Sequence, residues 1–371
     1  MKILIATGIY PPQMGGPATY SKLLHDELPK YGFDVSVCNF GDVLKFPKIV
    51  RHAVYFWKLL VASANVDAVY AQDPVSVGFP ALLASQVRSK KFILKIVGDY
   101  AWEQSTQRFG VTDRLDDFSI TSKKYPLRVR FLKKIQKYVA DGADKIVTPS
   151  NYLKGIISNW GVDVEKITVI YNAFDFKGLS VGKSVLRHKL GVAGTAIISA
   201  GRLVPWKGFF VLIEAFAEVK KEIHDAVLYI AGEGPLRAEL DKKSADCGIS
   251  ESVIFLGKVP QITLFEYLKA ADIFVLNTDY EGFSHQLLET MALGTPIITT
   301  PVGGNIELIE GGKTGILVNY NDKLKIADSV TTLVRDPVLA ETISRNAKVK
   351  VKEFSDERML GELAIFLKTN K

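Results

Sequence analysis

The chain has 371 residues, more than a single hydrophobic core usually supports, so we expect two domains. Hydrophobic residues make up 47% and charged residues 23%, a balance typical of a folded globular protein that excludes a disordered or membrane-spanning chain. Residues 1–178 carry 24 Lys and Arg against 16 Asp and Glu, whereas residues 179–371 carry 23 against 24. The basic first half suits nucleic acid, an anionic lipid or an anionic acceptor, and charge alone does not choose among them.

Neither the N-terminus nor the cysteines indicate export or metal binding. The apolar run at residues 3–6 is too short for a signal peptide or a spanning helix, so we expect a cytoplasmic protein. Cys38 and Cys247 lie far apart and have no C-x-x-C or Cys/His partner, which argues against a disulfide framework and against zinc. We expect both cysteines to be buried apolar residues.

Short β-branched runs bounded by Gly, Pro or Asp alternate with longer stretches of helical apolar spacing in both halves of the chain. The predicted strands are residues 3–6, 35–40, 68–71, 92–97, 145–148 and 167–171, and then 196–200, 227–231, 253–256, 273–276, 296–300 and 315–318. This alternation predicts βαβ units, and hence parallel sheets covered on both faces by helices. The fold class is therefore α/β, with two doubly wound, Rossmann-like domains.

The domain boundary is expected near residue 178, where the strand pattern lapses. The two domains are then residues 1–178 and 179–353, and residues 354–371 have the spacing of a final helix that can pack back on the first domain. In open α/β sheets, ligands bind at the carboxyl ends of the strands. We therefore expect the domains to face each other across a substrate cleft.

A glycine-bearing loop follows the first predicted strand and opens a helix. Gly15 and Gly16 have no side chain to keep backbone N–H groups away from an anion, and Pro17 stands at a favourable first-turn position. The loop is neither G-x-G-x-x-G nor a P-loop. A tight turn without a ligand is an equally good interpretation.

Two cations, Arg202 and Lys207, follow the first strand of the second half. They suit a diphosphate, although isolated loop charges are often simply solvated. Further along, Glu281 precedes a predicted helix at 287–293 and Glu289 lies within it. Each carboxylate can accept hydrogen bonds from a pair of vicinal sugar hydroxyls, and the first N–H groups of a helix can receive phosphate oxygens. The alternative without a ligand is that Glu281 is a helix-capping residue and Glu289 a surface residue.

Taken together, these segments resemble the family 4 glycosyltransferases, which are retaining enzymes of the GT-B fold. The matching pieces are Gly15-Gly16, 148–150, 171–175, Gly201-Arg202, Lys207-Gly208, 232–235, 281–289, 294–296 and Gly303-Gly304. They span most of the chain, which makes the set far more specific than any one motif.

The resemblance implies a role for each matching residue. Glu289 would bind the ribose hydroxyls, Glu281 the transferred sugar, and Arg202 and Lys207 the diphosphate. Phe283 and Ser284 would offer backbone donors, as would Gly16 from across the cleft, and the turn at 258–260 would line the base. The implied donor-binding set is Gly15, Gly16, Gly201, Glu233, Val259, Phe283, Ser284, Leu287 and Glu289.

The resemblance also implies metal-independent transfer of a hexose, most readily from a UDP- or GDP-sugar, to a glycan or lipid-linked acceptor. No cofactor and no divalent metal are expected, because two fixed cations can replace the charge of a magnesium ion. One position departs from the family pattern: Asp99 stands roughly where many relatives carry a His that contacts the donor sugar. Asp99 could bind a sugar hydroxyl, orient the acceptor or merely cap the next segment, and we count it among the candidate catalytic residues with Glu281, Arg202 and Lys207.

Two segments of the first half mix cations with large apolar residues. These segments are residues 45–60 and 128–137. Each can form a helix that docks on the anionic inner face of the cell membrane, or a helix that only covers the sheet. No nucleic-acid recognition module is present in the sequence. Two alternatives to a transferase stay open, namely a non-catalytic sugar-nucleotide-binding protein and a GT-B-fold sugar-nucleotide epimerase.

Overall fold

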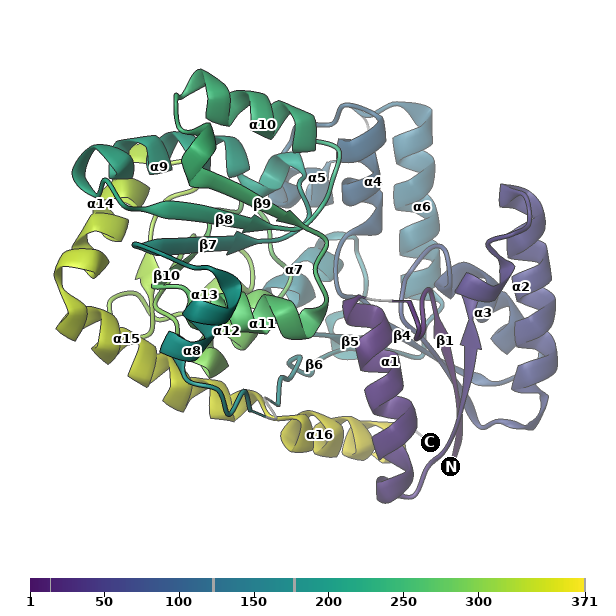
Figure 1. Cartoon of the computed structure of the whole chain (residues 1–371). Helices are drawn as coiled ribbons and strands as arrows, with labels where there is room; N and C mark the ends of the chain where they lie inside the picture. The colour runs from purple at the N-terminus through teal and green to yellow at the C-terminus, as the bar shows by residue number, and fades with distance from the viewer. Residues whose placement is uncertain (14, 122–123, 176–177, 370–371) are drawn as a thin grey trace. The chain divides into compact units, whose positions relative to one another are not determined.

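The computed structural model describes residues 1–13, 15–121, 124–175 and 178–369 (Figure 1). It divides into two compact units, one of residues 1–172 with 356–371 and one of residues 173–355. The predicted boundary at residue 178 lies a few residues beyond this division. None of the helices in these ranges is both long enough and apolar enough to cross a bilayer.

The first unit is built on a parallel sheet with the strand order β2-β1-β3-β4-β5-β6 within the described residues. Its strands are β1 (Lys2–Thr7), β2 (Asp34–Asn39), β3 (Ala68–Ala71), β4 (Lys91–Lys95), β5 (Lys145–Thr148) and β6 (Ile167–Val169). The helices are α1 (Gly16–Glu27), α2 (Lys48–Ala62), α3 (Gly78–Val87), α4 (Tyr100–Arg108), α5 (Leu115–Ile120), α6 (Leu127–Asp141), α7 (Asn151–Asn159) and α16 (Asp356–Thr369). Buried strands such as β3 are continuous apolar runs, as a sheet covered on both faces requires.

The second unit repeats this plan with the strand order β12-β11-β10-β7-β8-β9 in the part of the chain that the structure describes. Its strands are β7 (Ala196–Ala200), β8 (Val227–Ala231), β9 (Val253–Gly257), β10 (Ile273–Leu276), β11 (Ile297–Thr299) and β12 (Ile316–Leu317). The helices are α8 (Lys183–Leu190), α9 (Phe209–Glu222), α10 (Arg237–Asp246), α11 (Gln261–Ala270), α12 (His285–Leu293), α13 (Asn305–Leu308), α14 (Lys323–Arg335) and α15 (Pro337–Lys350). The predicted α/β class with two doubly wound sheets is confirmed.

Helices cover the second sheet in two layers. Helix α9 packs with α10 and α14, and α11 packs with α8 and α12. Apolar side chains such as Ile213 of α9 and Val275 of β10 fill one continuous core. The first strand, β7, has β8 on one side and β10 on the other, so the strand order reverses between β7 and β10. Ligands of such sheets bind at this switch point, beyond the carboxyl ends of the strands.

The last helix, α16, belongs to the first unit although the second unit precedes it in the chain. It packs on the short helix η1 (Leu28–Tyr31), and the ammonium of Lys368 lies over the ring of Phe33. One of the two cysteines is not as expected, because Cys38 is buried whereas Cys247 is only half-buried.

Candidate functional site

The loops that follow β7 and β10 meet at the switch point of the second sheet. The carbonyl of Trp206 accepts hydrogen bonds from the Asp279 amide at 2.8 Å and from the Thr278 hydroxyl at 3.1 Å. Asn277 donates to the Gly208 carbonyl at 2.9 Å. These bonds fix the loop that carries Lys207 against the loop that carries Glu281, so residues far apart in the sequence become neighbours.

Lys207 and Glu281, two of the predicted catalytic residues, form an ion pair through Nζ and Oε1. Their side chains are only 12% and 15% exposed, so solvent screens the pair less than it screens a surface salt bridge. A carboxylate held beside an ammonium can accept hydrogen bonds from sugar hydroxyls, while the ammonium can bind a neighbouring phosphate. The structure therefore brings together the residues predicted to hold the sugar and the diphosphate.

The loop after β11 supports the backbone of Glu281. The amide of Gly304 donates to the Glu281 carbonyl at 2.9 Å. Gly303 has a φ of +55°, and a Cβ there would lie 2.0 Å from the same carbonyl oxygen. Only glycine fits this position without displacing Glu281, because the φ is left-handed and the approach is backbone to backbone.

Helix α12 begins directly after the loop that carries Glu281. Ser284 is its N-cap, and its hydroxyl accepts from the Leu287 amide at 3.4 Å. The cap explains why the helix begins at His285 rather than at the predicted Leu287. Leu287, expected in the donor-binding set, has a fully buried side chain and donates its amide to the cap, and its part in donor binding stays a prediction. The backbone donors expected at Phe283 and Ser284 stay a prediction.

Glu289 lies on α12 with 8% of its surface exposed. Burial raises the pKa of its carboxyl to about 7, and a hydrogen bond from Gln261 acts in the opposite direction. Gln261 Nε2 donates to Glu289 Oε1 at 3.3 Å. Gln261, which the sequence analysis missed, is the first residue of α11 and follows the turn at 258–260. In the sequence, only its position directly after the turn predicted to line the base pointed to a role for Gln261 in the site.

The other predicted residues of this unit surround the same strand ends. The Arg202 side chain is exposed, without an ion-pair or hydrogen-bond partner among the described residues. Gly201 carries a backbone bend, and Gly232 packs so tightly on it that a Cβ would lie 1.9 Å from the Gly201 carbonyl. Glu233 is exposed and Val259 half-buried, so both can still reach a ligand.

In the first unit, Gly15 and Gly16 are exposed at the start of α1. The Gly15 carbonyl accepts from the amides of Ala18 and Thr19, which makes the loop a helix start with Pro in its first turn. The strand order reverses between β1 and β3, so this loop lies at the switch point of its own sheet. Anion binding by the loop stays a prediction.

Asp99 caps α4, which is one of the three roles considered for it. Its carboxylate accepts from the Trp102 amide at 2.9 Å, from Gln136 Nε2 at 3.0 Å and from Trp160 Nε1 at 3.1 Å. Burial raises the pKa of this carboxyl, and these hydrogen bonds oppose the rise. Both oxygens are engaged and the side chain is buried, so Asp99 has the capping role, and the catalytic role expected for it stays a prediction.

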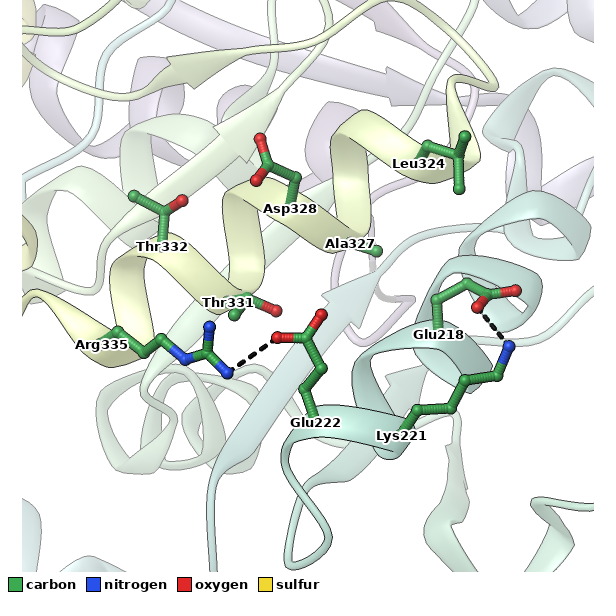
Figure 2. Close-up of a pocket in the computed structure, with 9 residues that line it drawn as sticks. All are labelled: Glu218, Lys221, Glu222, Leu324, Ala327, Asp328, Thr331, Thr332 and Arg335. Carbon is green, nitrogen blue, oxygen red and sulfur yellow. Dashed lines mark hydrogen bonds and ion pairs between the residues drawn. The ribbon is translucent and has the colours of Figure 1, made fainter.

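A surface pocket of about 370 Å³ lies between α9 and α14 (Figure 2). Figure 2 shows two ion pairs among its charged side chains, Arg335 with Glu222 and Lys221 with Glu218. Its α9 residues come from the last turns of that helix, which follows β7 and so ends toward the amino ends of the strands. The paired charges of the pocket leave little to recognise a ligand.

The comparisons with known proteins identify the family of the chain. Residues 14–177 match glycosyltransferase family 4, and residues 187–350 match glycosyl transferases group 1. N-acetyl-alpha-D-glucosaminyl L-malate synthase of Bacillus anthracis is 34% identical, over 98% of this chain and 96% of that protein. A GDP-mannose-dependent alpha-(1-6)-phosphatidylinositol monomannoside mannosyltransferase of Mycobacterium tuberculosis is 29% identical, over 55% of this chain and 56% of that protein.

Solved structures share the fold over the whole chain. The crystal structure of Anabaena HepE in complex with UDP-glucose has a TM-score of 0.78 at 21% identity and covers 100% of both chains. Sucrose-phosphate synthase from Thermosynechococcus elongatus has a TM-score of 0.79 at 18% identity, covering 99% of this chain and 98% of that one. The chain therefore belongs to the family 4 glycosyltransferases (glycosyl transferases group 1) and has their GT-B fold.

Proposed function

We propose that the protein transfers a hexose from a UDP- or GDP-sugar to a hydroxyl group of a glycan or lipid-linked acceptor, with retention of the anomeric configuration. The observation that carries the proposal is the Lys207–Glu281 ion pair, held beside the start of the helix that bears Glu289. HepE was solved with UDP-glucose, and the mycobacterial relative is named for GDP-mannose, which supports a nucleotide sugar as the donor.

In the proposed reaction, the bond between the anomeric carbon and the diphosphate oxygen breaks, and a bond to the acceptor oxygen forms. The acceptor hydroxyl passes its proton to an oxygen of the leaving phosphate. Lys207 and Arg202 stabilise the negative charge that the diphosphate carries as it departs. Because these cations are part of the chain, the proposal includes no metal ion and no cofactor.

The donor is best identified by thermal unfolding with a panel of UDP-, GDP- and ADP-sugars. A specific donor raises the melting temperature, because it binds only the folded protein. Glu289→Ala and Arg202→Ala are expected to abolish that rise; an unchanged rise in both variants would refute the assigned site.

Turnover then separates an enzyme from a sugar-nucleotide sensor. Nucleotide release from the stabilising donor is expected, at a rate that EDTA leaves unchanged. The anomeric configuration of the product, read by NMR, tests retention. Binding without release would instead favour the non-catalytic alternative, and a 2-epimerised sugar nucleotide would favour the epimerase.

A further inference from the structure

The first turns of α6 carry an exposed mixture of apolar and basic side chains. Leu127 is 79% exposed and Phe131 is 62% exposed, which is unusual for large apolar residues. Arg130 and Lys134 are exposed as well. At 100° per residue, these four positions fall within one face of the helix, and we call them the α6 patch.

The α6 patch lies at the carboxyl edge of the first sheet. Helix α6 leads directly into β5, so it runs antiparallel to the strands and begins near their carboxyl ends. Gln136, further along α6, bonds to Asp99, which follows the carboxyl end of β4. The turns before Gln136 therefore extend beyond this edge, and Figure 1 shows α6 rising beside α4.

The cations of the α6 patch are not neutralised by neighbouring acids. Arg130 and Lys134 form no ion pair within the described part of the chain. Other lysines of the region are engaged, since Lys124 pairs with Asp113 at 2.9 Å and Lys137 with Asp141 at 3.0 Å. The patch therefore presents net positive charge together with apolar side chains.

Lys133, on the inner side of α6, anchors the helix. Its ammonium donates to the carbonyls of Phe118, in the last turn of α5, and of Thr121, the residue that directly follows α5. Ile120, between these two residues in the chain, is 68% exposed. The patch is thus held on a rigid support rather than on a loose loop.

Helix α2, the other mixed segment, fits this description less well. Tyr55 of this helix is fully buried and donates to the Cys38 carbonyl at 2.9 Å. Lys58 pairs with Asp42 at 3.0 Å. Trp57 and Val61 are exposed, but the side chains of Lys48 and Ile49 lie outside the described residues. Among its described side chains, helix α2 therefore offers no comparable set of unpaired cations.

We propose that the α6 patch docks the protein on an anionic lipid surface and thereby delivers a lipid-linked acceptor to the carboxyl edge of the first sheet. The acceptor part of this inference rests on the proposed function; the docking part does not. Basic side chains attract anionic headgroups, and apolar side chains at the same level enter the interface. Exposed Leu127 and Phe131 favour lipid over nucleic acid, whose phosphates would need only the cations.

The test is co-sedimentation of the full chain with vesicles of phosphatidylcholine alone or mixed with phosphatidylglycerol. We expect binding only to the anionic vesicles, weakening as salt screens the charges. Arg130→Glu with Lys134→Glu is expected to lower the partition coefficient roughly tenfold or more. Leu127→Ser with Phe131→Ser should also lower it, at unchanged vesicle charge.

Matched controls come from the second unit. Lys242→Glu with Arg345→Glu changes the net charge by the same amount, and Val338→Ser with Val349→Ser removes two exposed apolar side chains. Both control pairs should sediment like the parent protein. The inference is overturned if the parent protein does not bind anionic vesicles at low salt, or if the α6 variants bind them as well as the parent does. It is also overturned if the protein binds RNA, and not vesicles, through the α6 patch.

Donor binding separates this inference from the proposed function. The α6 variants should keep the donor-induced rise in melting temperature, which also shows that they are folded. A protein that binds vesicles but no nucleotide sugar would leave the docking surface standing and remove the proposed transfer. A protein that binds the donor but no vesicle would leave the proposed transfer standing and remove the docking surface.

Discussion

Glu289 is the most unusual titratable group of the candidate site, because it is buried and has no counter-charge among the described residues. A buried carboxylate loses hydration, and the single bond from Gln261 compensates only in part. Ribose hydroxyls would supply further donors to the ionised form. The residue is therefore expected to lose its proton when a donor binds.

Donor affinity should depend on pH through Glu289. The pKa of its carboxyl in the free protein is about 7, so below this pH the protonated form dominates, and binding must first remove the proton. From about pH 8 to about pH 6, we expect the donor Kd to rise roughly tenfold, measured by calorimetry. Gln261→Ala removes the bond that lowers the pKa, so it should move this rise to higher pH, whereas Glu289→Gln should flatten the profile. A flat profile in the parent protein would contradict the assignment.

The ion pair between Lys207 and Glu281 should matter for turnover more than for stability. Lys207→Ala removes a donor aimed at the departing diphosphate, and losses of roughly 100-fold or more in kcat are typical of such donors. Lys189→Ala is the control, because it breaks another Lys–Glu pair of the same unit, with Glu266 at 2.6 Å, and Lys189 lies at the end of α8, before the amino end of β7. Steady-state nucleotide release measures both. Equal rates in the two variants would show that Lys207 is only a structural partner of Glu281.

At the scale of elements, loops after different strands hold one another in place. Gly303 illustrates this, since a side chain there would meet the Glu281 carbonyl. Gly303→Ala should lower the melting temperature and weaken donor binding, because Glu281 must move. Gly312→Ala is the matched control: its φ of +77° imposes similar backbone strain, but nothing lies within 4 Å of the added Cβ. Calorimetry of both variants isolates the clash, and equal donor affinities would argue that Gly303 does not position Glu281.

The elements themselves were largely predictable from the sequence. Strands buried on both faces are continuous apolar runs, so β3, β7 and β10 have the predicted bounds. Contacts between elements were not predictable, because they depend on packing: neither the Gln261–Glu289 bond nor the network around Asp99 leaves a mark on local sequence. Motif resemblance supplied the strand-end residues, and tertiary structure alone shows which of them touch.

For the whole molecule, the main feature is that the first unit is discontinuous in sequence. Its last helix, α16, buries Leu363 completely while Ile365 faces solvent. Leu363→Ala should cost about 2–5 kcal/mol of stability, and Ile365→Ala within about 0.5 kcal/mol. Hydrogen exchange is expected to show the loss in residues 1–172 rather than in 173–355, with donor binding retained. Loss of protection confined to the second unit would contradict the placement of α16.

The discontinuity also orders events during synthesis. Residues 1–172 leave the ribosome first, but α16, which packs on η1, follows only after residues 173–355 have been made. The later-made unit can therefore finish folding before the earlier one. Until the last residues emerge, the nascent first unit exposes the apolar surface that α16 will cover, and this surface is where a chaperone would find the growing chain.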